Sequence, residues 1–144
     1  MDVRWGYNNV CIKDGNQWKA AFKTNKGLYE PNVMFFGLTN SPVTFQTMMD
    51  DIFREEVAEG WLLTYIDNLL VFLDGTKEHH LSLITCVLQK LQDNDLFLEP
   101  EKCHFLQELV NYLGVIVGQH GIKMDPVKLK GLVDWPQPTT VMEV

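Results

Sequence analysis

The sequence predicts an α+β fold whose core follows the ferredoxin-like β-α-β-β-α-β order. A strand-like start at residues 1–3 is followed by apolar residues at helical spacing over residues 45–52. Residues 61–72 then contain two apolar runs joined by a short polar tip, as in a tight β-hairpin. A second helical pattern at residues 77–94 precedes a strand-like segment at residues 96–98. Strand, helix, hairpin, helix and strand therefore follow one another along the chain.

Between the first strand and the first helix, the pattern predicts an additional β-hairpin. Residues 18–24 and 28–35 are rich in aromatic and β-favouring side chains, and residues 25–27 supply the turn between them. Gly15 and Asn16 mark an earlier turn.

The first helix has clear start and stop signals. Ser41 offers a capping hydroxyl, and Pro42 suits the first helical position. Gly60 is placed to end the helix. The apolar positions that keep helical spacing are Phe45, Met48, Met49 and Ile52.

The hairpin at residues 61–72 carries a carboxylate at its tip. Asp67 and Asn68 tolerate the left-handed backbone that a two-residue turn requires, so an ordinary turn explains them when they are considered alone. Their significance depends on other polar residues, above all on Asp2 in the first strand.

The remainder of the chain is predicted to form one more long helix, several short strands and a final helix. The long helix shows its apolar stripe at Leu81, Ile84, Leu88 and Leu91. Asp125 and Pro126 open the final helix, which Pro136 and Pro138 end. Strand candidates lie at residues 96–98, 110–113, 115–117 and 122–124, with a turn at His120-Gly121.

Composition fits one ordinary globular domain of 144 residues, with 46% apolar and 22% charged residues. No apolar run approaches the roughly 18 residues that span a bilayer, so no membrane contact is expected. Cys11, Cys86 and Cys103 lack a C-x-x-C spacing, which favours free thiols and an intracellular location, cytoplasmic or nuclear. The net charge of −7 argues against a freestanding nucleic-acid-binding protein.

Five short segments, in this order, resemble the motifs of reverse transcriptases, most closely those of gypsy-type LTR retrotransposons. The first three resemble motifs A, B and C of that family, and the match extends from residue 2 to about residue 138. The segments are residues 2–7, 36–46, 65–68, 100–105 and 112–114.

The resemblance implies that residues 1–144 are a palm-domain fragment of such an enzyme. Residues 11–36 would then be the remaining strands of the fingers, and residues 125–144 a helix and linker toward the thumb. In this family much of the basic surface lies in the fingers and thumb, which reconciles an acidic fragment with a nucleic-acid enzyme.

The resemblance also implies a catalytic site. Asp2 and Asp67 would bind Mg²⁺ or Mn²⁺ weakly, because Asn68 stands where the family has a second aspartate and removes one negative charge. Lys102 matches a lysine proposed to protonate the leaving pyrophosphate, although an ordinary solvated lysine explains it equally well.

Further positions match the nucleotide-binding residues of the family. Trp5 and Gly6 correspond to residues whose backbone amides meet the triphosphate, and Tyr7 to the aromatic ring that stacks under the incoming sugar. Phe36 and Gln46 correspond to positions near the nucleotide and the template. Without the resemblance, Tyr7 would be interpreted as a half-buried aromatic residue.

The intact enzyme would bind an RNA or DNA template-primer and a dNTP and perform RNA-directed DNA synthesis. We expect this chain by itself to be inactive and to form a homo-oligomer, and whether it is an enzyme stays open. One alternative is a non-catalytic, palm-derived interaction or dimerisation module. Another is a general nucleic-acid-binding domain, for which Trp18-Lys19 and Phe22-Lys23 are the nearest approach to an aromatic and basic surface.

Overall fold

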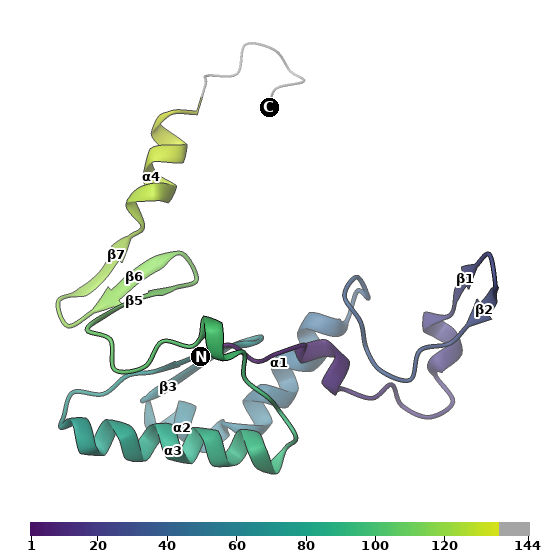
Figure 1. Cartoon of the computed structure of the whole chain (residues 1–144), viewed down its shortest axis with the longest axis horizontal. Helices are drawn as coiled ribbons and strands as arrows, with labels where there is room; N and C mark the ends of the chain where they lie inside the picture. The colour runs from purple at the N-terminus through teal and green to yellow at the C-terminus, as the bar shows by residue number, and fades with distance from the viewer. Residues whose placement is uncertain (136–144) are drawn as a thin grey trace. The chain divides into compact units, whose positions relative to one another are not determined.

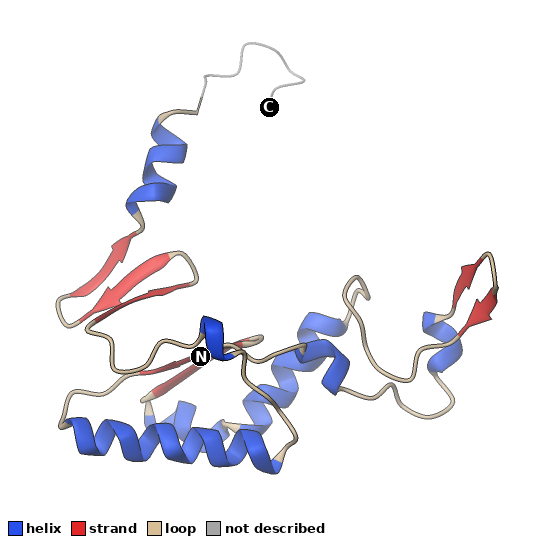
Figure 2. Ribbon diagram, viewed as in Figure 1, coloured by secondary structure: helices blue, strands red, loops and turns tan. Residues whose placement is uncertain are grey.

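The computed structural model describes residues 1–135, which fall into two compact units, one ending at Cys103 and the other beginning at His104 (Figure 1). Helices and strands are mixed in both units (Figure 2). Unit 1 contains the 3₁₀ helices η1 (Gly6–Asn9), η2 (Gln17–Ala20) and η3 (Pro100–Lys102), the strands β1 (Phe22–Thr24), β2 (Gly27–Tyr29), β3 (Leu62–Tyr65) and β4 (Asn68–Val71), and the helices α1 (Ser41–Ile52), α2 (Arg54–Glu59) and α3 (Lys77–Asp93).

The antiparallel hairpin β3–β4 continues into two further extended segments of unit 1. On one side, Asp2 forms a β-bridge with Asn68, the first residue of β4. On the other side, Val3 forms a bridge with Leu98. The N-terminal segment therefore lies between β4 and the segment around Leu98, each contact being antiparallel. The strand expected at residues 96–98 is present only as this single bridge.

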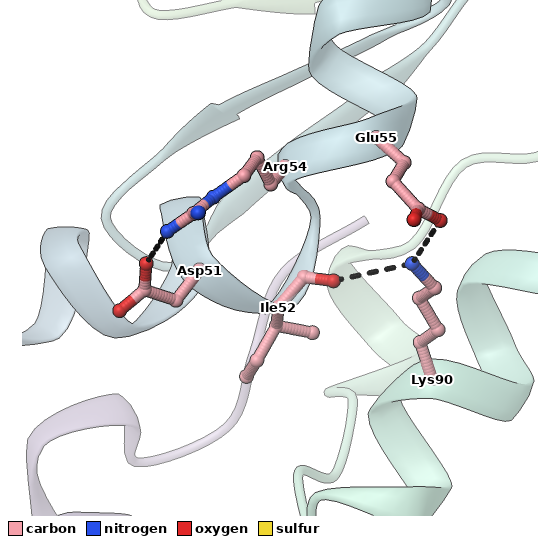
Figure 3. Close-up of a pocket in the computed structure, with 5 residues that line it drawn as sticks. All are labelled: Asp51, Ile52, Arg54, Glu55 and Lys90. Atoms are coloured by element: carbon pink, nitrogen blue, oxygen red, sulfur yellow. Dashed lines mark hydrogen bonds and ion pairs between the residues drawn. The ribbon is translucent and has the colours of Figure 1, made fainter.

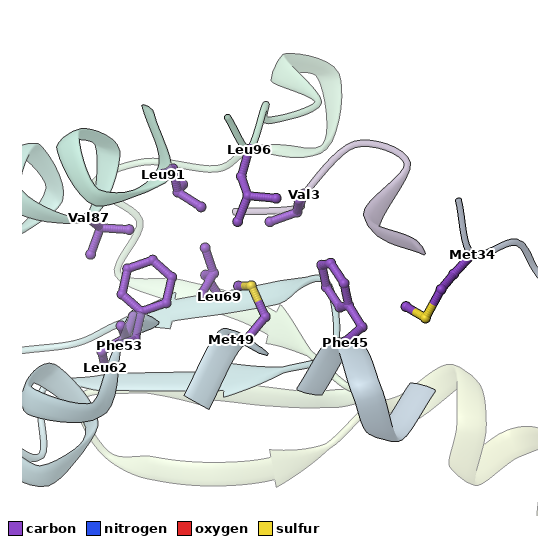
Figure 4. Close-up of a cluster of buried hydrophobic side chains, with 10 residues drawn as sticks. All are labelled: Val3, Met34, Phe45, Met49, Phe53, Leu62, Leu69, Val87, Leu91 and Leu96. Atoms are coloured by element: carbon purple, nitrogen blue, oxygen red, sulfur yellow. The ribbon is translucent and has the colours of Figure 1, made fainter. Parts of the chain in front are cut away.

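One hydrophobic core stabilises unit 1, and residues from its helices, its β3–β4 hairpin and its N-terminal segment contribute to it (Figure 4). Phe45 and Met49, one helical turn apart on α1, are completely buried. On α3 the expected positions Ile84 and Leu91 are buried, but Leu81 and Leu88 are 42% and 40% exposed, and Val87, which the predicted stripe left out, is completely buried. The buried residues of the core are Val3, Met34, Phe45, Met49, Phe53, Leu62, Leu69, Val87, Leu91 and Leu96.

The first helical region consists of two helices where the sequence predicted one. Phe53 interrupts it with φ −109° and ψ 23°, and its side chain is completely buried. The break lets this ring enter the core, a tertiary effect that helical periodicity does not reveal. Gly60 ends α2 with φ 81°, as expected from its lack of a Cβ atom.

The start of α1 also differs by one residue from the prediction. Asn40 is the N-cap residue, and Ser41 is the first residue of the helix. The Ser41 hydroxyl donates a hydrogen bond to the Phe35 carbonyl at 3.2 Å, so it fixes the preceding loop and does not cap the helix.

The β3–β4 turn has Ile66 and Asp67 at its two central positions, because Tyr65 pairs with Asn68. The predicted tip of Asp67 and Asn68 was therefore wrong by one residue. Asn68 is drawn into β4, where it also bridges Asp2. Ile66 adopts φ 52°, a left-handed conformation that β-branched residues rarely occupy.

The additional hairpin predicted before the first helix is present as β1 and β2, but it is shorter than expected. Its strands β1 and β2 are antiparallel and three residues long, and Lys23 pairs with Leu28. Trp18 lies in η2 and not in a strand, and the segment after β2 forms only a single bridge, between Cys11 and Val33.

Unit 2 contains an antiparallel sheet in the order β5 (Leu109–Tyr112), β6 (Val115–Gly118) and β7 (Gly121–Met124), followed by α4 (Pro126–Val133). Leu113 and Gly114 join β5 to β6 with φ values of 51° and 80°, the positive pair that a type I′ turn requires. The Asp125 carboxylate accepts a hydrogen bond from the Val127 amide at 2.9 Å and so helps to start α4. The predicted end of this helix at Pro136 and Pro138 lies outside the described residues.

No helix among residues 1–135 is both long enough and apolar enough to cross a membrane.

Candidate functional site

The two aspartates predicted to share a site lie on neighbouring extended segments. The Val3 amide donates to the Asp67 carbonyl at 2.8 Å, directly beside the bridge between Asp2 and Asn68. Burial raises the pKa of the Asp2 carboxyl; the Lys102 cation opposes this shift, and the negative charge of Asp67 adds to it. Asp2 and Asp67 are thus close enough for their charges to interact.

Asn68 is coupled directly to the hairpin carboxylate. Its side-chain nitrogen donates to Asp67 Oδ1 at 2.9 Å. An aspartate at this position would place a negative charge where the amide now donates a hydrogen bond. The Asn68 amide therefore gives the Asp67 carboxylate a hydrogen-bond donor within the protein. Compared with an aspartate at this position, it also offers a cation one negative charge fewer.

Lys102 occupies η3 and reaches two carboxylates. Its Nζ lies 2.9 Å from Glu99 Oε2 and 3.7 Å from Asp2 Oδ1. The hydrogen bond to Glu99 and then the charge of Asp2 raise the pKa of Lys102, so its ammonium group keeps its proton at neutral pH. The structure therefore brings Lys102 to the edge of the acidic site, and Glu99 is a partner that the sequence pattern did not reveal.

Of the five predicted nucleotide-binding residues, Trp5, Gly6 and Tyr7 lie at the start of η1, and Phe36 lies in the loop before α1. The Tyr7 ring packs edge-on against Phe45 of α1, with centroids 5.8 Å apart, and lies 6.3 Å from the Phe36 ring. A Cβ atom at Gly6 would lie 2.9 Å from the Phe45 ring, so only glycine permits this approach. Phe36 itself is 88% exposed.

Trp5 directly precedes η1 and adopts a left-handed conformation, with φ 53°. The Arg4 guanidinium lies 4.3 Å from the centre of the Trp5 ring, a cation–π contact. Trp5 is 68% exposed, so it presents aromatic surface to solvent close to Asp2 in the sequence, as Phe36 does beside Tyr7.

Gln46 contacts the hairpin that carries Asp67. From α1, its Oε1 accepts a hydrogen bond from the Ile66 amide at 2.5 Å. Its Nε2 donates to Asp50 Oδ1 at 2.7 Å and contacts Thr64 Oγ1 at 3.3 Å. Asp50 and Thr64 were missed by the sequence analysis, although the four-residue spacing of Gln46 and Asp50 on a helix is a signal that would have linked them.

The donor atoms at the site suit a hard divalent cation. Carboxylate oxygens are the ligands that Mg²⁺ prefers, and this ion is commonly held by one or two carboxylates together with substrate phosphates. Among the described residues, no group of three or more His, Cys, Asp or Glu side chains is arranged to hold a metal. Asp2 and Asp67 supply carboxylate donors of the kind that such an ion shares with substrate phosphates.

A surface pocket lies elsewhere, where α1 meets α2 and α3 passes nearby (Figure 3). Its lining residues are Asp51, Ile52, Arg54, Glu55 and Lys90. Ion pairs occupy these side chains, since Arg54 pairs with Asp51 and Lys90 pairs with Glu55. It contains none of the predicted site residues.

The chain belongs to the reverse transcriptase (RNA-dependent DNA polymerase) family, whose model matches residues 1–117. The retrovirus-related Pol polyprotein from transposon 297 of Drosophila melanogaster is 38% identical to it over all 144 residues. The Pol polyprotein from transposon gypsy of the same organism is 33% identical over the same length. The predicted resemblance to gypsy-type elements is confirmed.

The chain corresponds to a small part of these relatives. It spans 13% of the transposon 297 polyprotein and 14% of the gypsy polyprotein. Among solved structures, the foamy viral protease–reverse transcriptase in complex with double-stranded DNA matches 99% of this chain with a TM-score of 0.87 and 22% identity. The foamy viral enzyme in complex with an RNA/DNA hybrid matches with a TM-score of 0.83. These two structures share the fold of the chain, which covers 24% and 19% of them.

Proposed function

We propose that the chain is the palm part of a retrotransposon reverse transcriptase, built on a ferredoxin-like core. The main support is the position of the N-terminal segment, which is hydrogen-bonded between β4 and the segment around Leu98. Asp2 therefore lies on the segment next to Asp67. Residues 11–36 would be fingers strands, and residues 125–144 would lead toward a thumb.

In the intact enzyme this site would support template-directed DNA synthesis on an RNA or DNA template-primer. Two bound Mg²⁺ or Mn²⁺ ions would supply charge neutralisation and orientation for in-line nucleotidyl transfer. Asp2 and Asp67 would hold the metal. Tyr7 and Phe36 offer ring surface for the dNTP, while Trp5 and Gly6 offer backbone amides to its phosphates. The Lys102 ammonium lies 3.7 Å from Asp2 and would be the general acid that protonates the leaving pyrophosphate.

A metal titration tests this assignment directly. We expect Mn²⁺ to broaden the NMR signals of residues around Asp2 and Asp67 first, because a paramagnetic ion affects its nearest nuclei most. Asp2→Asn and Asp67→Asn should each weaken the effect, whereas Asp14→Asn, in the turn before η2, should not. Broadening that is unchanged in both site variants would contradict the proposed metal ligands.

The second candidate function is a non-catalytic interaction or dimerisation module. Asn68, which replaces a charged ligand, and the exposed aromatic residues around β1 and β2 favour it. We propose an intracellular setting for either function, cytoplasmic or nuclear, because Cys11, Cys86 and Cys103 are all free thiols.

A further inference from the structure

The hairpin tip that carries Asp67 is held from outside the hairpin. Ile66 adopts the unfavourable φ of 52°, and its amide donates to Gln46 Oε1 on α1. A left-handed conformation at a β-branched residue persists only where surrounding contacts enforce it. The bond from Gln46 is one such contact, and it works only when the amide oxygen of Gln46 faces the turn.

Asp50 determines which end of that amide faces the turn. Asp50 Oδ1 accepts from Gln46 Nε2 at 2.7 Å, and an ionised carboxylate only accepts hydrogen bonds. Thr64 Oγ1 also donates to Asp50 Oδ1, at 3.2 Å, so the carboxylate is linked to β3 as well as to Gln46. With the nitrogen of Gln46 directed to Asp50, the oxygen is left to accept from Ile66.

We propose that Asp50 is a positioning residue for the Asp67 carboxylate, acting through the amide orientation of Gln46. Asp50 is exposed on α1, and its side-chain hydrogen bonds within the described residues go to Gln46 and Thr64. Its effect passes through two hydrogen bonds, from Asp50 to Gln46 and from Gln46 to the backbone of the turn. The link to metal or nucleotide chemistry rests on the function proposed above, but the effect on the turn does not.

Amide hydrogen exchange of Ile66, followed by NMR on the metal-free chain, measures this effect. Asp50→Ala should speed exchange of the Ile66 amide about fivefold to tenfold, the range expected for one lost hydrogen bond. The amides of Leu63 and Leu69, in the same hairpin, should change much less. Asp51→Ala removes the same charge at the next position of α1 and should leave Ile66 unchanged.

A reciprocal exchange of groups tests the orientation itself. Gln46→Glu places two carboxylates against each other and should speed Ile66 exchange as Asp50→Ala does. Adding Asp50→Asn lets the new amide at position 50 donate to the carboxylate at position 46, whose other oxygen can accept from the Ile66 amide. The double variant should therefore recover slow exchange. Recovery of this kind is not expected if the two residues merely contribute to helix stability.

Equal acceleration of Ile66, Leu63 and Leu69 in Asp50→Ala would show general destabilisation and overturn the proposal. Unchanged Ile66 exchange in that variant would overturn it as well. A Mn²⁺ titration of the same variants separates this question from the proposed function. If Mn²⁺ does not bind near Asp67 in the unaltered chain, the metal site fails, while the exchange measurements still decide the role of Asp50.

Discussion

Asn68 changes the chemistry of the site by a single charge. Its side chain donates to Asp67 Oδ1 at 2.9 Å and its backbone forms a β-bridge with Asp2, so it is a direct neighbour of both aspartates. Divalent ions of this class bind carboxylate oxygens more strongly than amide oxygens because of the added charge. The residue therefore links the fold of the hairpin to the strength of the proposed metal site.

Restoring the carboxylate should strengthen metal binding. We expect Asn68→Asp to raise the Mn²⁺ affinity about tenfold or more. Changing residues that only hydrogen-bond to the ligands of a metal already alters its affinity by about 10- to 100-fold, and a charged ligand should matter at least as much. Isothermal titration calorimetry of the two proteins measures the difference. Asn16→Asp, a change of the same charge away from the site, is the control. Equal affinities in Asn68→Asp and the unaltered chain would mean that Asp2 and Asp67 do not share an ion.

At the scale of elements, an ion pair between the buried Glu56 and the partly exposed Lys90 joins α2 to α3. Glu56 is 4% exposed, and its Oε1 lies 2.7 Å from Lys90 Nζ. Lys90 also donates to the Ile52 carbonyl at 3.3 Å, at the point where α1 ends. The helix break at Phe53 thus lies close to the Lys90 ammonium group on α3. This ammonium group contacts both the end of α1 and Glu56 on α2.

Removing Lys90 should be costly, because it leaves a buried carboxylate without its cation. We expect Lys90→Met to lower the free energy of unfolding by about 3 kcal/mol, and Glu56→Leu/Lys90→Met to recover most of that loss. Urea denaturation measures both. Arg54→Met, which breaks the exposed pair with Asp51, is the control and should cost less than about 1 kcal/mol. A double variant as unstable as Lys90→Met would show that the helix packing itself depends on these side chains.

The same pair determines how this part of the stability depends on pH. The hydrogen bond to Glu56 raises the pKa of Lys90 above its ordinary value of 10.5. A cation whose folded pKa is raised stabilises the fold fully below the unfolded pKa, and the contribution is lost as pH rises through the folded pKa. The stabilisation by Lys90 should therefore be complete at neutral pH and should disappear only in strongly alkaline solution.

At the scale of the whole molecule, the chain spans 13% to 14% of the polyproteins to which it is related. Positioning of substrates supplies a large part of the lowering of an enzymatic barrier. We expect that this chain by itself does not position a template and primer and, with Asn68 at the proposed site, does not extend a primer in Mg²⁺. A primer-extension assay decides this. Template-dependent extension that disappears in Asp67→Ala would contradict the prediction.

Exposed aromatic surface leads to a second expectation for the whole chain. Around β1 and β2, Trp18 is 62% and Phe22 47% exposed, and further apolar side chains lie nearby. Apolar patches of this kind commonly bind a partner, and a two-fold dimer is the commonest closed assembly. The net charge of −7 opposes association but is screened at physiological salt.

We therefore expect a homodimer, and light scattering coupled to size exclusion measures it. Trp18→Ser/Phe22→Ser should shift the chain toward monomer. Leu88→Ser, which alters an exposed apolar residue on α3, is the matched control and should not. A monomer at high micromolar concentration in the unaltered chain would contradict the expectation.

The sequence by itself determined the family, the order of the elements and the hairpin that carries Asp67, because these depend on local spacing and short motifs. The helix break at Phe53, the shift of the hairpin tip to Ile66 and the bond from the Ile66 amide to Gln46 were decided by the tertiary structure. In each case a group gains a partner from a distant segment. Phe53 enters a core built from several elements, and Asn68 joins β4 because Asp2 lies beside it. Such long-range contacts outweigh local propensity, and no local pattern in the sequence records them.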